Sequence, residues 1–236
     1  MIMVQAQVKP RLQIDLSLEK RDKAVILLSG GLDSTTLLYY MISQGYDCYP
    51  LSISYGQKHK KEVIAARNIS EACGLIKSWK VINLDMLGNL LPSALTSSDE
   101  VPEGHYQEES MKQTVVPGRN LIFLAIAAGY AEGLEAKVVA YAAHAGDHYI
   151  YPDCRPEFVK AAREAIKIGY DTDLLTPFIN IDKGEVVKIG TQLKVPYYMT
   201  WTCYNGGDKH CGRCGACNER KEAFIKAGIE DPTKYE

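Results

Sequence analysis

The stretch VILLSGGLDSTTLLYY, residues 25–40, decides the fold of this chain. A run of apolar and β-branched residues ends at Gly30 and Gly31, and an acid and three hydroxyl residues then precede a second apolar run. Short apolar runs without alternation are typical of strands that are buried on both faces of a parallel sheet. The stretch therefore predicts a strand, a glycine turn and then a helix over residues 34–44.

The glycine turn has the properties of an anion site. Gly30 and Gly31 permit positive φ angles, so successive backbone N–H groups can surround an anion, and the predicted helix adds the positive end of its dipole. Open α/β sheets bind ligands at this end of their strands. A purely structural turn capped by Asp33 or Ser34 is the alternative. The turn lacks the G-x-x-x-x-G-K-[ST] lysine and the dinucleotide fingerprint, so it predicts neither γ-phosphate transfer nor NAD binding.

The composition is that of an ordinary globular protein of 236 residues, with 46% hydrophobic residues, 24% charged residues and a net charge of −2. This length suits one large α/β domain with a small appendage, or two small domains. No run approaches the ~20 apolar residues that cross a bilayer, and residues 1–22 lack the apolar block of a signal peptide. We therefore expect a cytoplasmic protein that contacts no membrane and binds no nucleic acid directly.

Strand-like and helical patterns alternate along the chain. Strands are expected at residues 24–28, 48–53, 79–84 and 137–143, and helices at 34–44, 59–72, 121–132, 156–168 and 182–193. This alternation predicts an α/β fold with a doubly wound, mostly parallel sheet. Asp182 and Glu185 have the spacing of an N-terminal capping box. Residues 88–118 and 145–155 show neither period and are expected to be loops that form lids or binding sites.

A cluster of cysteines near the C-terminus predicts a metal site. Four of the seven cysteines lie within residues 203–217, at Cys203, Cys211, Cys214 and Cys217. Four thiolates suit a tetrahedral zinc ion, and a shell filled by protein ligands makes such a site structural. An iron–sulfur cluster is the competing interpretation, because clusters are also held by cysteines alone. Asp208 and His210 lie inside this loop and are expected to be solvated.

Five motifs carry a family resemblance. The SGGLDSTT stretch, residues 29–36, matches the SGGxDS signature of the PP-loop ATP pyrophosphatases, which cleave ATP between its α and β phosphates. The others are SYGQKH (54–59), VPGRN (116–120), YPDCRPEF (151–158) and TWTCY (200–204). In this order, with the four cysteines, they resemble the 7-cyano-7-deazaguanine synthase (QueC) family from about residue 23 to residue 227. Taken singly, Arg119 could be a surface charge, His59 a helix-start residue and Asp153 a cap.

One segment departs from the family pattern. Residues 144–150, HAGDHYI, precede YPDCR where better-known members carry a shorter D-Y-S-G-like stretch, which leaves detailed substrate contacts open. Residues 1–22 carry no motif and form an N-terminal arm that is expected to be either disordered or an added edge strand. The rest of the chain divides into a PP-loop ATP-binding domain over residues 23–195 and a zinc-binding segment over residues 196–236.

The resemblance implies an activity and its cofactors. It implies a Rossmann-like, adenine nucleotide alpha hydrolase-like fold with a small zinc-binding appendage, one structural Zn²⁺ per chain and a homodimer. The implied reaction is that of an ATP-dependent C–N ligase in queuosine and archaeosine biosynthesis. It converts 7-carboxy-7-deazaguanine and ammonia to the nitrile through adenylated intermediates. Mg²⁺ is expected with ATP, with Asp33 as a candidate ligand.

The motifs also assign candidate site residues. Those expected to bind the nucleotide are Leu28, Ser29, Gly30, Gly31, Leu32, Asp33, Ser34, Thr35, Thr36, Leu37 and Leu38. The candidate catalytic residues are Asp33, Ser34, Lys58 and Arg119. The candidate substrate-binding residues are Tyr55, Gln57, His59, Arg119, Asn120, Asp153 and Arg155. Among these, the cations suit the substrate carboxylate and phosphates, and the Asp153 carboxylate suits the guanine-like edge.

Other functions are compatible with parts of this pattern. A related PP-loop enzyme could stop at the amide, or could use deazaguanine chemistry to modify a protein in a defence system. A tRNA thiolation enzyme fits less well, because a basic RNA-binding extension and a sulfur-carrying cysteine pair would be expected. From another class, a zinc-stapled nucleotide-binding module without catalysis remains an alternative, which the release of AMP or pyrophosphate would exclude.

Overall fold

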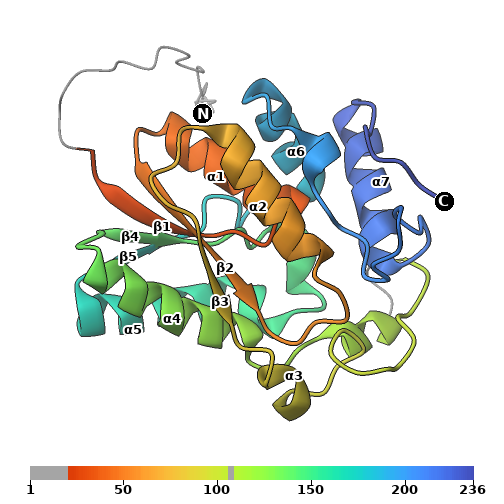
Figure 1. The fold of residues 1–236 in the computed structure, drawn as a ribbon, viewed down its shortest axis with the longest axis horizontal. Coiled ribbons are helices and arrows are strands. Elements are labelled where there is room, and N and C mark those ends of the chain that lie inside the picture. Colours follow the sequence, from red (N-terminus) through yellow and green to blue (C-terminus); the bar gives the residue numbers. More distant parts are fainter. Residues whose placement is uncertain (1–20, 106–108) are drawn as a thin grey trace, which may run out of the picture.

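Five parallel strands form one sheet in the computed structural model, which describes residues 21–105 and 109–236 (Figure 1). The strand order is β3-β2-β1-β4-β5, and every neighbouring pair is parallel. The strands are β1 (Lys23–Leu27), β2 (Asp47–Ser54), β3 (Lys80–Asn83), β4 (Val138–Ala140) and β5 (Asp173–Leu175). The predicted doubly wound parallel sheet is therefore confirmed.

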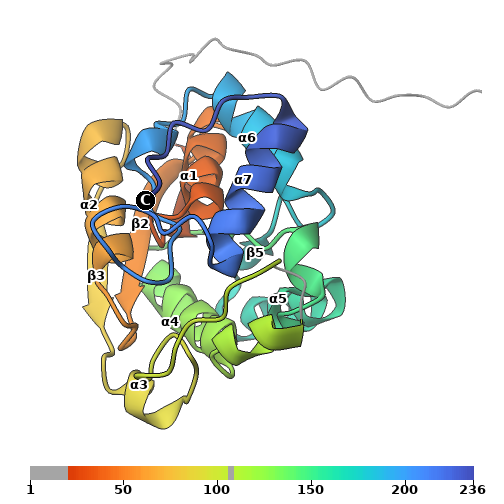
Figure 2. The same cartoon turned by 90° about the vertical axis from the view of Figure 1, so that its right-hand side faces the viewer.

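Helices cover both faces of the sheet (Figure 2). One face carries α1 (Leu32–Ser43), α2 (Lys61–Cys73), α6 (Lys183–Gln192) and α7 (Gly215–Ala227), and the other carries α4 (Arg119–Gly133) and α5 (Pro156–Tyr170). Each face has its own apolar core. Leu37, Val186 and Phe224 belong to the first core, whereas Leu124 and Val159 belong to the second. Burial on both faces explains why the strands are apolar throughout.

The strand order by itself indicates where a ligand site lies. The chain runs outward from β1 to β2 and β3, then crosses back to β4 on the other side of β1. At such a reversal the loops that leave the two central strands diverge to opposite faces and open a crevice at the strands' carboxyl ends. The glycine turn after β1 lies at this point, as do residues 141–143 after β4.

The predicted elements are present, with shifted ends and some omissions. The capping box at the start of α6 is confirmed, since Asp182 accepts from the Glu185 N–H at 3.1 Å and Glu185 accepts from the Asp182 N–H at 3.1 Å. Sequence patterns missed β5 and α7. The expected loops contain short helices, namely α3 (Leu87–Leu90), η1 (Glu109–Thr114), η2 (Ala145–His148) and η3 (Pro152–Cys154), and η4 (Tyr197–Met199) precedes the cysteines.

The C-terminal segment packs on the same core as the sheet. The Phe224 side chain is buried in the first core, and α7 lies against α6. Arg220 of α7 is fully buried and donates to Thr200 at 2.7 Å, to the Tyr197 carbonyl at 3.1 Å and to Asp231 at 3.2 Å. The buried cation therefore joins α7 to the chain on both sides of the cysteines.

Most of the expected N-terminal arm lies outside the described residues. Within residues 21–105 and 109–236, none of the helices combines the length and the apolar character that crossing a bilayer requires. All seven cysteines lie in the described ranges and all are free, in agreement with a metal site in place of a disulfide framework.

Candidate functional site

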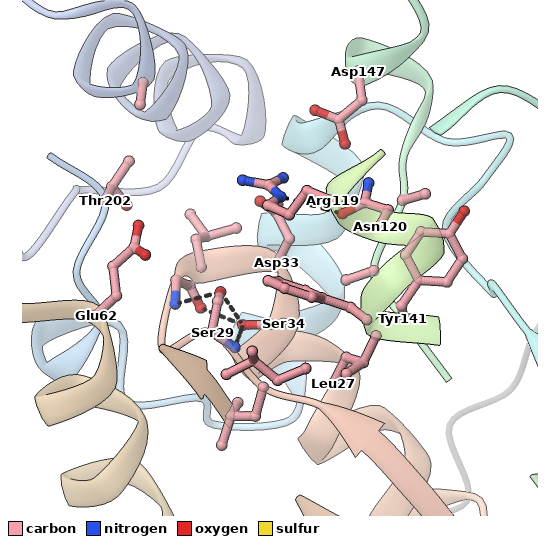
Figure 3. A pocket seen from close by; sticks show the side chains of 18 of the residues that line it. Leu27, Ser29, Asp33, Ser34, Glu62, Arg119, Asn120, Tyr141, Asp147 and Thr202 are labelled. Atoms are coloured by element: carbon pink, nitrogen blue, oxygen red, sulfur yellow. Dashed lines mark hydrogen bonds between the residues drawn. The ribbon is translucent and has the colours of Figure 1, made fainter. Parts of the chain in front are cut away.

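A cavity opens at the carboxyl ends of β1 and β4, where the strand order reverses (Figure 3). The parts of the chain that line it include the glycine turn, residues 141–143 after β4, the start of α4, and the segment of Trp201, Thr202 and Tyr204 beside the cysteines. The motifs that were separate in the sequence thus face one space.

Two serines hold the glycine turn in shape. The hydroxyl groups of Ser29 and Ser34 lie 2.9 Å apart, the Ser29 N–H donates to Ser34 Oγ at 3.2 Å, and the Gly31 N–H donates to Ser29 Oγ at 3.2 Å (Figure 3). Gly30 has a φ of 88°, and a side chain there would overlap the carbonyl of Glu62 and the N–H of Ala66 in α2. The turn is therefore a fixed loop pressed against α2.

The first turn of α1 faces the cavity without a side-chain cap. Gly31 is the N-cap residue, and none of the described side chains accepts from the first-turn N–H groups. These N–H groups have no intrahelical acceptor, and they sit at the positive end of the helix dipole. The arrangement suits an anion such as a phosphate.

The residues predicted to bind the nucleotide divide into two sets. Those that line the cavity are Leu28, Ser29, Gly31, Leu32, Asp33 and Ser34. Gly30 is not among the residues that line the cavity, and it packs against the backbone of α2. Those buried in α1, away from the cavity lining, are Thr35, Thr36, Leu37 and Leu38. Of these, Thr36 bonds to the Tyr197 hydroxyl at 2.9 Å, so it packs α1 against the segment after α6.

A buried lysine joins the turn to the C-terminal helix. Lys183, at the start of α6, lies 3.1 Å from Asp33 and 2.6 Å from Glu219 of α7, and all three side chains line the cavity. Burial opposes the charge on Lys183, but the two carboxylates outweigh it and raise the pKa of Lys183. Burial raises the pKa of Glu219, although Lys183 and His144 partly offset it. Lys183 therefore stays a cation at the floor of the cavity.

His144 lies in the segment that departs from the family pattern, and it is 1% exposed. Its Nε2 atom is 3.5 Å from Asp147 and 3.9 Å from both Asp33 and Glu219. The donor atoms of His144, Asp147 and Glu219 lie within 4.8 Å of one another, as in a metal site. However, the Gly146 N–H donates to Nδ1 at 3.1 Å, so a neutral His144 carries its proton on Nε2. In this arrangement His144 donates toward the carboxylates.

Arg119 and Tyr55 form the opposite wall. Arg119 begins α4 and is half-buried, with its guanidinium 5.7 Å from the centre of the Tyr55 ring and 3.5 Å from the Tyr55 hydroxyl. Gln57 and Asn120, also predicted to bind substrate, line the same cavity. The structural alternative for Arg119, a surface charge, is wrong, because the side chain faces the cavity.

Lys58 and His59, from the SYGQKH motif, are not among the residues that line the cavity. Lys58 is exposed and donates to the carbonyl of Asp99. The His59 ring packs edge-on against Trp201 at 6.1 Å, and a side chain at Gly206 would overlap it. Burial lowers the pKa of His59. The catalytic role of Lys58 and the substrate contact of His59 stay predictions.

Asp153 and Arg155 also lie outside the cavity lining. Asp153 accepts from the Asn120 N–H at 3.1 Å, at the start of α4. Arg155 donates to the carbonyl of His148 at 2.9 Å. In this structure the Asp153 carboxylate therefore bonds to the first turn of α4, whereas α5, the helix that its own motif opens, has no side-chain cap. Substrate contacts by Asp153 and Arg155 stay predictions.

The four cysteines converge on one point. Their sulfur atoms all lie within 4.8 Å of one another, all four residues are buried, and the Sγ atoms of Cys211 and Cys217 are 4.0 Å apart. Backbone N–H groups of Cys211 and Cys214 donate to the sulfurs of Cys203 and Cys211 at 3.3 Å. Hydrogen bonds from Cys214 and Cys217 lower the pKa of Cys203. This group can hold a metal ion.

The expectation that His210 is solvated is wrong. His210 is 6% exposed, its ring stacks 4.3 Å from Trp201, and its Nε2 accepts from the Thr202 N–H at 3.1 Å. Burial lowers the pKa of His210 to about 4, so the ring is neutral. It supports the segment that carries Trp201 and Thr202 to the cavity, whereas Asp208 is fully exposed.

Sequence reasoning missed several cavity residues, namely Glu62, Asp147, Lys183 and Glu219. Each lies near a feature that was noticed: Glu62 follows SYGQKH, Asp147 is in the departing segment, Lys183 follows the capping residue and Glu219 follows the last cysteine. None of these four residues belongs to a motif. They come together at the cavity only because the fold brings distant parts of the chain side by side.

Comparisons with known proteins agree on one family. The profile described as "Queuosine biosynthesis protein QueC" matches residues 23–228. The 7-cyano-7-deazaguanine synthase of Caldicellulosiruptor saccharolyticus is 51% identical over 218 residues, which are 91% of this chain and 96% of that protein. The synthase of Methanoregula boonei is 52% identical, over 91% of this chain and 99% of that protein. Among solved structures, an NMN synthetase from Francisella tularensis has a TM-score of 0.50 at 14% identity, over 90% of this chain and 79% of that one, a likeness of fold alone.

Proposed function

This chain belongs to the QueC family of queuosine biosynthesis proteins, and we propose that it converts 7-carboxy-7-deazaguanine and ammonia to 7-cyano-7-deazaguanine with ATP. It is a ligase with the PP-loop, adenine nucleotide alpha hydrolase-like fold. The observation that carries the proposal is that the SGGLDS turn, the uncapped start of α1 and Arg119 face one cavity.

The reaction follows from the chemistry of a carboxylate. A carboxylate oxygen attacks the α-phosphorus of ATP, pyrophosphate leaves, and the acyl adenylate then loses AMP when ammonia attacks its carbonyl carbon. The amide oxygen attacks a second ATP in the same way. Loss of AMP and a proton from the resulting imidoyl adenylate leaves the C≡N group. Both activations need stabilisation of charge at the α-phosphate.

The chain's own groups supply that stabilisation. N–H groups at the start of α1, including that of Ser34, are fixed donors for the phosphates, and fixed donors stabilise a developing charge without reorganisation. Lys183 adds a cation on the same side, and Arg119 on the opposite wall suits the substrate carboxylate. We keep Lys58 and Arg155 as further candidate cations, which would have to move into the cavity.

Asp33 fits the Mg²⁺ that accompanies ATP. Its Oδ2 is paired with Lys183 at 3.1 Å, but its Oδ1 is buried without a hydrogen-bond partner among the described residues. An orphaned carboxylate oxygen suits a hard cation or a water bound to one. When bound with ATP, Mg²⁺ neutralises phosphate charge.

The cysteine group fits a structural zinc ion. A tetrahedral ion with Zn–S distances of ~2.3 Å requires sulfur atoms about 3.8 Å apart. The 4.0 Å between Cys211 and Cys217 is close to this value. The shell is filled by four thiolates, so the ion has no open position for substrate. We propose that it fixes the segment of Trp201 and Thr202 at the cavity.

We also propose a cytoplasmic homodimer that acts on small molecules and does not bind nucleic acid. Support for the dimer comes from the sheet edge: Val81 on edge strand β3 is 47% exposed, and Met86 and Leu90 after it are 79% and 72% exposed. Edge strands with exposed apolar side chains need a cover. Val81→Lys should shift the protein toward monomer in size-exclusion chromatography with light scattering.

One assay tests the activity directly. Purified protein is incubated with ATP, Mg²⁺, ammonium and 7-carboxy-7-deazaguanine, and the products are identified by mass spectrometry. We expect the nitrile, with AMP and pyrophosphate. Asp33→Ala should abolish turnover, and the exposed control Asp171→Asn should retain it. Accumulation of the amide alone would support an amide synthetase, a protein conjugate the defence-type enzyme, and no nucleotide cleavage the non-catalytic module.

A further inference from the structure

Four carboxylates line the cavity, and three of them already have partners. Asp33 and Glu219 pair with Lys183, and Asp147 lies 3.5 Å from His144. The fourth, Glu62, projects from the first turn of α2 into the site (Figure 3). It therefore stands apart from the cluster that surrounds Lys183.

Glu62 has no partner of its own within residues 21–105 and 109–236. Among the described residues, no side chain forms a hydrogen bond or an ion pair with its carboxylate. The side chain is half-buried, and burial raises the pKa of Glu62 to about 7, although the more distant charge of Arg119 lowers it in part. A desolvated carboxylate without donors is costly, so the fold retains at this wall an acceptor that a ligand can satisfy.

The side chains that line the cavity with Glu62 indicate what kind of ligand it would bind. Tyr55 and Trp201 line the same cavity and add aromatic surface to it, and Arg119 adds a cation. A ligand that satisfies all of them is a flat heterocycle with a carboxylate at one end and N–H donors at the other. The proposed substrate has this form, because its 7-carboxylate and its aminopyrimidinone edge lie on opposite sides of the ring system.

We propose that Glu62 is the residue that recognises the deazaguanine ring, by accepting hydrogen bonds from its ring N1–H and its exocyclic 2-amino group. Two parallel donors match the two oxygens of one carboxylate. The adenine of ATP offers donors from a single exocyclic nitrogen, so it matches this acceptor less well. The inference rests on the proposed function and gives Glu62 the part that sequence reasoning gave to Asp153, whose carboxylate caps α4 in this structure.

The experiment measures selectivity for the 2-amino group. Wild-type protein and Glu62→Gln are assayed with 7-carboxy-7-deazaguanine and with its 2-desamino analogue. We expect the wild type to favour the natural substrate by on the order of 100-fold in kcat/KM, because a site built around a substrate N–H rejects an analogue that lacks it. In Glu62→Gln the preference should fall to ~10-fold or less, since a glutamine presents only one acceptor.

Controls separate recognition from folding and from nucleotide binding. Glu71→Gln makes the same chemical change on the same helix, where Glu71 is exposed and pairs only with Arg67. It should leave selectivity at the wild-type value. Metal content and the affinity for a non-hydrolysable ATP analogue should be unchanged in Glu62→Gln, which shows that the variant is folded and that its nucleotide site is intact.

The remaining outcomes overturn the inference in distinguishable ways. A Glu62→Gln variant that loses rate but keeps its selectivity would make Glu62 a general base, and one that loses ATP or Mg²⁺ affinity would place it at the phosphates. If wild-type protein does not convert 7-carboxy-7-deazaguanine at all, the proposed function fails, irrespective of Glu62.

Discussion

The ammonium group of Lys183 lies 3.1 Å from the Asp33 carboxylate, and this ion pair joins the glycine turn to a helix 150 residues further along the chain. The same ammonium lies 2.6 Å from Glu219, which follows the last cysteine by two residues. The first turns of α1 and α6 are thereby tied to α7. The proposed nucleotide site therefore depends on a contact made by the C-terminal helix.

Removing the lysine charge should be costly. In Lys183→Met, Asp33 and Glu219 remain buried without a cation, and loss of one partner of a buried pair costs about 3–5 kcal/mol. Chemical denaturation should show this loss, and AMP release should disappear because the phosphate site loses its cation. Lys226→Met is the matched control: Lys226 pairs with Asp182 at 2.8 Å but is 65% exposed, so its removal should change neither measurement appreciably.

The glycine turn tolerates no side chain at Gly30. Its φ of 88° already disfavours an L-residue, and a Cβ would overlap the backbone of α2. Gly30→Ala should therefore lower the free energy of unfolding by well over the ~1–2 kcal/mol of a left-handed alanine, and should abolish AMP release. Gly45 has the same φ of 88° and no atom within 4 Å of the Cβ position. Gly45→Ala therefore measures the cost of the positive φ angle alone. Equal losses of unfolding free energy in Gly30→Ala and Gly45→Ala would contradict a role for packing of Gly30 against α2.

The metal site should support stability as well as position. Cys211→Ser removes one of four converging ligands, and because metal binding is coupled to folding, we expect the loss of bound zinc with a stability loss of at least ~3 kcal/mol, or about 6–12 °C in Tm. Elemental analysis and calorimetry measure both. Cys73→Ser, at a half-buried cysteine far from the cluster in sequence, should keep one zinc per chain. Iron in the wild-type protein would identify the competing cluster.

The sheet could be predicted because its central strands are continuous apolar runs, and the site could be predicted where a local motif dictates geometry. The turn of Gly30 and Gly31 and the four cysteines are of this kind. Strand β5 escaped because it has three residues, too few to show a period. Helix α7 escaped because its exposed face is strongly polar, and it also buries Glu219 and Arg220, charged residues that no apolar stripe predicts.

The missing part of the site depends on long-range pairing. Nothing local distinguishes Lys183 or Glu62 from the chain's other charged residues. Lys183 reaches the cavity only because α6 crosses beside Asp33, and Glu62 only because the start of α2 packs against Gly30. Conversely, Asp153 belongs to a motif, yet its carboxylate accepts from the Asn120 N–H. The motifs therefore predicted which parts of the chain lie near the cavity, but not which of their side chains face it.

Glu62 should make the stability of the ligand-free protein depend on pH. Burial raises its pKa from the ordinary 4.5 to about 7, so between these values the unfolded chain ionises first and unfolding is favoured. Stability is therefore retained at pH 4.5 and lost as the pH rises through 7. Arg119 and Tyr55 are the charged and titratable groups that interact with Glu62 from α4 and the loop after β2, and neither changes charge in this range. Thermal unfolding between pH 5 and pH 8 should show the Tm of wild type falling relative to that of Glu62→Gln, with Glu71→Gln following the wild type.

The affinity for substrate should rise with pH, whereas the stability falls, because only the ionised Glu62 carboxylate accepts two hydrogen bonds. The dissociation constant of the substrate should therefore fall by up to ~10-fold per pH unit below 7. Parallel Tm curves for wild type and Glu62→Gln would show that no desolvated carboxylate stands at this wall.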